Sequence, residues 1–363
     1  MNVENLIKSR NIPELLRLNC GRAVENAADF EIRKKEIKKL LQEEIYGVIP
    51  KKPDHMQVSL ASENPVFCAG KADRKDLIFT VTVGEAEASF PVISVIPKGK
   101  TSCPAFVFMN FSPDSPDKYL PIEEIVDSGF AVFSFCHKEV TSDSGDFKHG
   151  IAPLFRKSRT PLNAPGKIAM WAWAAMRVMD YVETLDSIDL DNVAVVGHSR
   201  LGKTALLAGG FDERFKYVIS NDSGCSGAAL SRGKQGESVA VITNVFPYWF
   251  CPRYVANAAT YEERGYDQHF LLALTAPRVL MVGSAEEDLW ADPESEFLCT
   301  AAASEAFRLY GNRGLVHNDE VPTAKSVLDE GDILYHVRRG THYMSREDWQ
   351  EYMKYITKMM ESK

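Results

Sequence analysis

A serine lies where the chain passes from a strand-like run into a helix-like run. The run NVAVVGHS is apolar and of strand length, and LGKTALLAGGF has helical composition, so Ser199 falls at the turn between them. Gly197 stands two residues before the serine, whereas Leu201 takes the second position after it and Gly202 follows one residue late. Such a turn exposes a hydroxyl at the edge of a sheet and predicts a nucleophile; the alternative is a serine that only caps a helix.

A serine hydroxyl attacks well only when a base takes its proton and an acid orients that base. His342 follows the last strand-like run, on a loop opened by Gly340, so it is the predicted base. His198, beside the serine, and His269, at the start of an apolar run, are predicted to pack rather than to react.

Two groups of carboxyls are candidates for the acid. Asp222 follows the run YVIS, whereas Glu286, Glu287 and Asp288 follow the next run, RVLMVGS. Position alone favours the second group. The residues by themselves leave the choice open, because a triad needs one carboxylate only.

Four linked motifs resemble those of the glucuronoyl esterases, carbohydrate esterase family 15. They are GHSRLGK at 197–203, SNDSGCSGAALSR at 220–232, SAEEDLWADP at 284–293, and GTHY followed by Asp348 and Trp349. The resemblance implies an α/β-hydrolase fold and a serine esterase without metal or cofactor. It also implies cleavage of the ester between lignin alcohols and (4-O-methyl-)glucuronic acid on xylan.

The same resemblance implies a role for each matching residue. Asp222 takes the place of the family's acid, although many members have glutamate there, so Glu287 and Asp288 stay open as partners of His342. Glu237 is a weaker match to a sugar-binding glutamate. The other implied roles are nucleophile for Ser199, oxyanion stabilisation for Arg200, contact with sugar hydroxyls for Lys203, a sugar-pocket wall for Trp290, and the catalytic base for His342.

The elements that must position these residues alternate along the chain. An amphipathic helix is predicted over 30–46, and β-favouring runs over 56–97 predict an antiparallel lead-in. Later apolar runs alternate with helical segments, which predicts a mostly parallel sheet flanked by helices in a three-layer α/β sandwich. We expect one domain over 1–363, with a lead-in over 1–100, a catalytic core over 101–363 and an insertion near 225–270.

Composition excludes several classes of partner. The formal charge is −8, from 42 Lys and Arg against 50 Asp and Glu, and no basic cluster occurs, so no nucleic-acid partner is predicted. No apolar segment reaches the roughly 18 residues of a membrane span. Charged residues near the N-terminus exclude a signal peptide, which predicts a cytoplasmic protein as given, or a secreted or periplasmic one if an export signal has been removed. The seven scattered cysteines, without a C-x-x-C pair, predict reduced thiols and no zinc site.

The residues predict a serine carboxylic-ester hydrolase, and the resemblance implies that it acts on esters of (4-O-methyl-)glucuronic acid, with glucuronoxylan fragments as the substrate and no cofactor. One alternative is an acetyl xylan esterase or another carbohydrate-ester deacetylase with the same machinery. A second is a catalytically silent hydrolase fold that binds glycans. The sequence predicts no particular oligomeric state.

Overall fold

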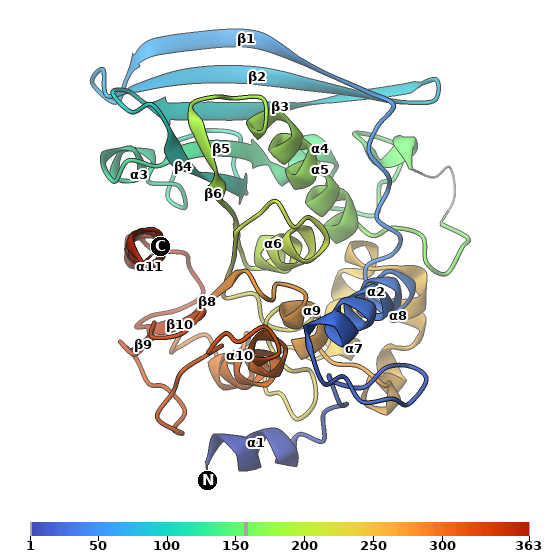
Figure 1. The fold of residues 1–363 in the computed structure, drawn as a ribbon. Helices are drawn as coiled ribbons and strands as arrows, with labels where there is room; N and C mark the ends of the chain where they lie inside the picture. Colours follow the sequence, from blue (N-terminus) through green and yellow to red (C-terminus); the bar gives the residue numbers. More distant parts are fainter. Residues whose placement is uncertain (1, 156–158, 363) are drawn as a thin grey trace.

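The protein is described by a computed structural model that covers residues 2–155 and 159–362 (Figure 1). Its strands form one sheet and confirm the predicted succession of runs. The strands are β1 His55–Phe67, β2 Ala72–Val83, β3 Ala86–Pro97, β4 Cys103–Asn110, β5 Ala131–Cys136, β6 Ile188–His198, β7 Tyr217–Asn221, β8 Val279–Ala285, β9 Val327–Leu328 and β10 Ile333–Arg338.

The sheet has the order β1-β2-β3-β5-β4-β6-β7-β8-β10-β9. The predicted antiparallel lead-in is confirmed, because β1, β2, β3 and β5 pair antiparallel in succession. From β5 to β10 all neighbours run parallel, and β9 closes the far edge antiparallel to β10. Every residue of β4, β5 and β8 is buried, as expected of strands covered on both faces.

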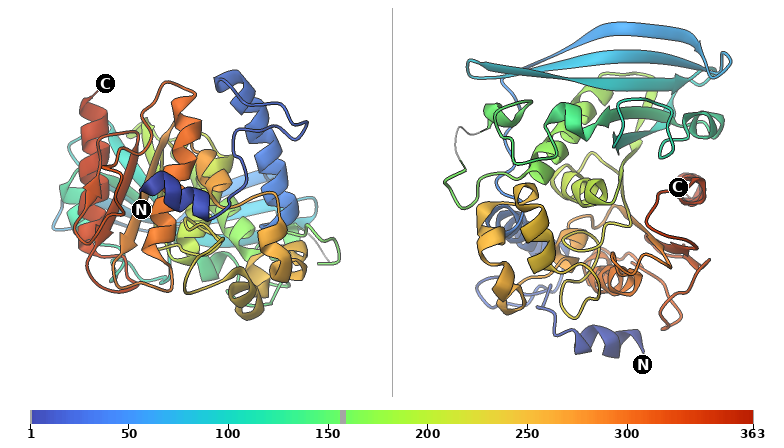
Figure 2. Two further views of the ribbon diagram at one scale, coloured as in Figure 1. Left: turned by 90° about the horizontal axis from the view of Figure 1, so that it is seen from below. Right: turned by 180° about the vertical axis from the view of Figure 1, so that it is seen from behind.

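Helices cover both faces of the sheet (Figure 2). The helices α3 and α11 pack on one face, where Trp349 contacts Phe106 and Phe108 edge-on. The other face is covered by a larger layer that includes α2, α5, α6, α9 and α10. The bounds are α1 Val3–Ser9, α2 Ala27–Glu44, α3 Ile122–Asp127, α4 His137–Val140, α5 Lys167–Val182, α6 Arg200–Phe211, α7 Val239–Val245, α8 Pro252–Ala256, α9 His269–Ala273, α10 Pro293–Arg308 and α11 Arg346–Glu361.

Residues 225–270, the predicted insertion, form the short helices α7 and α8, the start of α9, and two 3-10 turns. This segment lies beside α2 in Figures 1 and 2, and the Cys251 N–H donates to the carbonyl of Ile45 at the end of α2. The run FPYWF is within it. The segment thus joins the helical layer on the face of α5 and α6.

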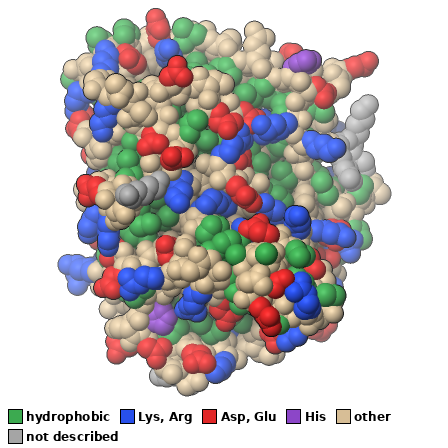
Figure 3. All heavy atoms as spheres, viewed as in Figure 1, with side chains coloured by type: hydrophobic (Ala, Val, Ile, Leu, Met, Phe, Trp, Pro, Cys, Tyr) green, Lys and Arg blue, Asp and Glu red, His purple; other side chains and the backbone are tan. Residues whose placement is uncertain are grey.

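The surface charges and the state of the cysteines are those that the composition predicts. On the face shown in Figure 3, basic and acidic side chains are interspersed. None of the helices in the described part of the chain has the length and apolar character needed to cross a bilayer. The seven cysteines are free thiols, five of them buried.

Candidate active site

Ser199 forms the predicted sharp turn between β6 and α6. Its backbone has φ 58° and ψ −126°, a strained conformation for a residue with a side chain. Two glycines make the turn possible: a Cβ on Gly197 would lie 2.1 Å from the carbonyl oxygen of Leu201, and one on Gly202 would lie 2.9 Å from Ser223 Cβ. The Ser199 N–H donates to the Asn221 carbonyl at 2.8 Å, which fixes the turn against β7.

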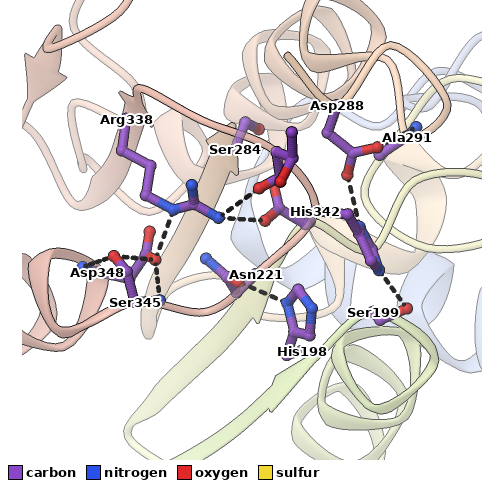
Figure 4. A network of polar contacts seen from close by, with 12 residues as sticks. His198, Ser199, Asn221, Ser284, Asp288, Ala291, Arg338, His342, Ser345 and Asp348 are labelled. Carbon is purple, nitrogen blue, oxygen red and sulfur yellow. Dashed lines mark hydrogen bonds and ion pairs between the residues drawn. The ribbon is translucent and has the colours of Figure 1, made fainter. Parts of the chain in front are cut away.

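A chain of hydrogen bonds joins Ser199, His342 and Asp288 (Figure 4). The Ser199 hydroxyl donates to His342 Nε2 at 2.9 Å, and His342 Nδ1 donates to Asp288 Oδ2 at 2.6 Å. The structure therefore brings the predicted nucleophile and base together. This is the geometry in which a carboxylate fixes the imidazole tautomer and leaves Nε2 free to take a proton.

The acidic hydrogen-bond partner of the His342 imidazole is Asp288, which corrects the predicted placement of Asp222 there. The loops after β8 and β10 are tied together, because the N–H of Glu286 donates to the Arg338 carbonyl and that of Glu287 to the Gly340 carbonyl. This pairing carries Asp288 onto His342. Burial alone raises the pKa of Asp288, but the hydrogen bond and the charge of His342 outweigh it, so the net pKa lies below its usual value.

Asp222 has a different role in the structure. Its carboxyl is buried and accepts a hydrogen bond from Arg338 Nη2 at 3.1 Å. Burial, with the nearby charges of Glu296 and Asp348, holds the pKa of Asp222 well above its usual value. The placement of Asp222 came from the family resemblance, whereas position along the chain favoured the group after the next strand. The pairing of the loops after β8 and β10 puts Asp288, and not Asp222, on His342.

Arg338 anchors the histidine loop and escaped the sequence analysis. Its Nε donates to Asp348 Oδ2 at 2.8 Å and its Nη2 to the Thr341 carbonyl at 3.0 Å. Asp348 also accepts from the N–H of Ser345 at 2.7 Å, which closes the loop onto the start of α11. The sequence did offer one signal for Arg338, which is a charged residue at the end of the apolar run ILYHVR. A buried strand would bury this arginine too, and a buried arginine needs a buried partner.

The ligand atoms of Asp222, Asp288 and His342 lie within 4.8 Å of one another, a spacing that a metal ion could also use. Each group already has a partner, however. His342 binds Asp288, and Asp222 accepts from a guanidinium whose positive charge opposes a cation. The donor set thus fits a proton relay better than a metal centre.

A cleft of about 550 Å³ opens over the serine. The lining residues are Phe111, Ser112, Asp117, Lys118, Tyr119, His198, Ser199, Arg200 and His342. The side chain of Arg200 is 28% exposed and lies in this wall. As the first residue of α6, Arg200 also has a backbone N–H with no acceptor inside the helix. Arg200 and Ser199 thus line the same cleft.

The two other histidines pack, as predicted. His198 is buried, its Nδ1 donates to Asn221 Oδ1 at 2.7 Å, and its ring centroid lies 4.6 Å from that of His342. Burial lowers the pKa of His198 to about 3, so its ring stays neutral beneath the base. His269 is buried and donates from Nε2 to the Pro13 carbonyl at 3.0 Å.

The three predicted sugar-binding residues differ in accessibility. Trp290 is 56% exposed, so it is not a core residue, and its carbonyl accepts from the Glu237 N–H at 3.1 Å. Glu237 is half-buried. Lys203 is buried and donates to the Ser223 carbonyl; burial lowers its pKa, while the charge of Glu237 acts in the opposite direction. The structure brings Trp290 and Glu237 together and turns the Lys203 ammonium toward the backbone.

Comparison with known proteins places this geometry in a family. A sequence model described as "Glucuronyl esterase, fungi" matches residues 79–311, more than half of the chain. A carbohydrate esterase from an unknown prokaryotic organism is 40% identical over 237 residues, which are 64% of this chain and 54% of that protein. The match thus spans about half the length of that relative.

Two further relatives cover more of the chain. A protein of Neurospora crassa named 4-O-methyl-glucuronoyl methylesterase is 30% identical over 314 residues, 83% of this chain and 73% of that protein. The solved structure of a glucuronoyl esterase from Solibacter usitatus has a TM-score of 0.89 at 30% identity and covers 95% of this chain and 97% of that one. The predicted α/β-hydrolase fold, with its mostly parallel central sheet, is confirmed. The chain belongs to the glucuronyl esterase family.

Proposed function

We propose that this protein hydrolyses esters of (4-O-methyl-)glucuronic acid, as in lignin–glucuronoxylan linkages, through an acyl-enzyme on Ser199. The hydrogen-bonded chain Ser199–His342–Asp288 carries the proposal, since it supplies a nucleophile and a base that line one cleft and an acid bound to that base. The names of the Neurospora crassa relative, a 4-O-methyl-glucuronoyl methylesterase, and of the Solibacter usitatus protein, a glucuronoyl esterase, support the uronate ester as substrate.

The reaction follows from the positions of these groups. Ser199 Oγ attacks the uronate carbonyl while its proton passes to His342 Nε2, and Asp288 stabilises the imidazolium that forms. Arg200 and its backbone N–H stabilise the oxyanion; removing one such donor typically slows an enzyme by about 10² to 10³. His342 then gives the proton to the leaving alcohol, and water resolves the acyl-enzyme by the reverse transfer.

The sugar end of the substrate is matched chemically by the three predicted sugar-binding residues, Trp290, Glu237 and Lys203. A uronate carries several hydroxyls, which match cationic and carboxylate groups beside an aromatic face better than an apolar slot. We assign Trp290 to stacking on the sugar ring, and Glu237 and Lys203 to its hydroxyls. For Lys203 this requires its ammonium to turn away from the Ser223 carbonyl when substrate binds.

The test compares two ester classes on one preparation. The expected result is hydrolysis of methyl glucuronate at a higher kcat/KM than of acetylated xylo-oligosaccharides, with no turnover by Ser199→Ala. A fluorophosphonate probe should label wild-type Ser199 and leave the alanine variant unlabelled. Faster deacetylation than uronate cleavage would refute the substrate, and absence of labelling would favour a silent scaffold.

A further inference from the structure

Asp143 is a buried carboxylate in contact with the guanidinium of Arg200. It lies on the loop after α4, and its side chain is only 7% exposed. Asp143 Oδ2 accepts from Arg200 Nη1, and its Oδ1 accepts from the Trp249 indole N–H at 2.7 Å. The two oxygens thus connect the residue beside the nucleophile to the aromatic run FPYWF in the insertion.

Aromatic rings surround the same guanidinium. Its central carbon lies 4.8 Å from the ring centroid of Trp249, and 5.7 Å from those of Phe111 and Phe246. Trp249 and Phe246 stack on each other with centroids 3.9 Å apart. A cation over an aromatic face is attracted by the ring quadrupole, so these rings stabilise the guanidinium in addition to its contact with Asp143.

The loop that carries Asp143 is itself anchored on α5. Lys167 Nζ donates to Thr141 Oγ1 at 2.6 Å, and the Trp171 indole N–H donates to the Thr141 carbonyl at 3.2 Å. His137 adds a second contact, with its Nε2 3.4 Å from Asp143 Oδ2 and its Nδ1 donating to the Asn110 carbonyl at 3.0 Å. These buried contacts hold the Asp143 carboxylate in place, so the carboxylate can in turn hold the Arg200 guanidinium in place.

The charge balance shows why Arg200 needs this partner. A cation in the first turn of a helix opposes the helix dipole, and an arginine side chain loses rotamer entropy when it is fixed. Asp143 offsets both by presenting a negative charge. Burial alone raises the pKa of Asp143, but His137, Trp249 and the charge of Arg200 together lower it below its usual value, so Asp143 stays ionised.

We infer that Asp143 is a positioning residue of the esterase reaction: through its contact with Arg200 Nη1 it holds the guanidinium so that Nη2 meets the oxyanion formed at Ser199. The inference rests on the proposed serine-esterase function. It assigns to Asp143 an effect on the transition state, since a ground-state carbonyl carries little of the charge that Arg200 stabilises. A preorganised donor of this kind costs no rearrangement at the moment of reaction.

Asp143→Asn is the direct test. The amide oxygen can still accept from the Trp249 indole, while the charge that holds Arg200 is lost. Because misplacement of a group by about 1 Å can cost about 100-fold, we expect kcat to fall by about 10- to 100-fold, with KM within about twofold of wild type. Asp146→Asn is the matched control: it makes the same change three residues along the loop, where the side chain contacts Lys148 and His149, and should leave kcat within about twofold.

A double-mutant cycle separates positioning from a merely structural role. If Asp143 acts through Arg200, then Asp143→Asn should lower kcat by no more than about twofold in an Arg200→Ala background. An equal loss in both backgrounds would overturn the inference, as would a rise in KM at unchanged kcat. Trp249→Phe is a second variant, for use if Asp143→Asn does not fold. It removes the indole donor to Asp143, keeps a ring beneath Arg200, and should lower kcat by about 3- to 10-fold through the same misplacement.

The cycle is also measured on the rate of phosphonylation of Ser199 by the fluorophosphonate, in which fluoride leaves and negative charge develops on the phosphonyl oxygen, at the position that the ester carbonyl oxygen would take. Coupling in that rate, together with no cleavage of methyl glucuronate by the wild type, would refute the proposed substrate and support the role of Asp143. Additive effects of the two substitutions, in a wild type that does cleave methyl glucuronate, would refute the role of Asp143 and support the proposed substrate.

Discussion

The choice of Asp288 over Asp222 as the triad acid leads to the most specific prediction. In Asp288→Asn, the side-chain oxygen should keep accepting from the Ala291 N–H, which now donates to Asp288 Oδ1 at 3.2 Å. The amide nitrogen then faces His342 Nδ1. Because both would be donors, the imidazole must move its proton to Nε2, where it can no longer take one from Ser199. A wrong tautomer of this kind lowers kcat by about 10⁴ in the serine protease precedent.

Asp222→Asn should behave differently. The amide oxygen can still accept from Arg338 Nη2, and burial, which raises the pKa of Asp222, already disfavours the charge that the substitution removes. Since the change weakens one charge-assisted hydrogen bond of about 1.5 to 3 kcal/mol without breaking the relay, the loss in kcat should stay within about tenfold.

The assay is steady-state kinetics on methyl glucuronate for wild type and both variants, with thermal unfolding to show that each variant is folded. A loss in Asp222→Asn that equals or exceeds the loss in Asp288→Asn would refute the reasoning. It would mean that the imidazole turns to Asp222 when substrate binds.

Three other changes test the turn, the buried charges and the sugar side. In Gly197→Ala, the new Cβ meets the Leu201 carbonyl at 2.1 Å, so the free energy of unfolding in urea should fall by about 1 to 3 kcal/mol; an unchanged value would contradict the tight turn. Burial raises the pKa of Glu296 from 4.5 to about 7, so ionisation of this group costs stability as pH rises through that window. At about 1.4 kcal/mol per pKa unit, Glu296→Gln should gain up to about 3 kcal/mol over wild type in urea unfolding between about pH 4 and about pH 8, and a constant difference would refute the shift. Trp290 is 56% exposed, so Trp290→Ala should raise KM for the uronate ester by about 3- to 10-fold at unchanged melting temperature; an unchanged KM would remove Trp290 from the sugar site.

Much of the fold could be predicted because it rests on local pattern. Apolar runs such as AFVFMNF and RVLMVGS indicate strands buried on both faces, and they became β4 and β8. The helix predicted over 30–46 became α2, which begins slightly earlier because Asn26 caps it through the N–H of Asp29. Short elements such as α3, and the long α10 and α11, escaped the sequence analysis.

The amino-acid sequence by itself determined the reactive turn and the histidine loop. Gly197 and Gly202 allow the strained backbone at Ser199, and strands that run parallel end at one edge of the sheet, which brings His342 to the serine. Only the tertiary structure decided which carboxylate meets the imidazole and what holds Arg200. Asp288 reaches His342 because two loops pair through backbone hydrogen bonds, and Asp143 reaches Arg200 from a separate loop. The physical reason is that such contacts join loops that are distant along the chain, and the conformations of these loops cannot be read from the local pattern of residue types.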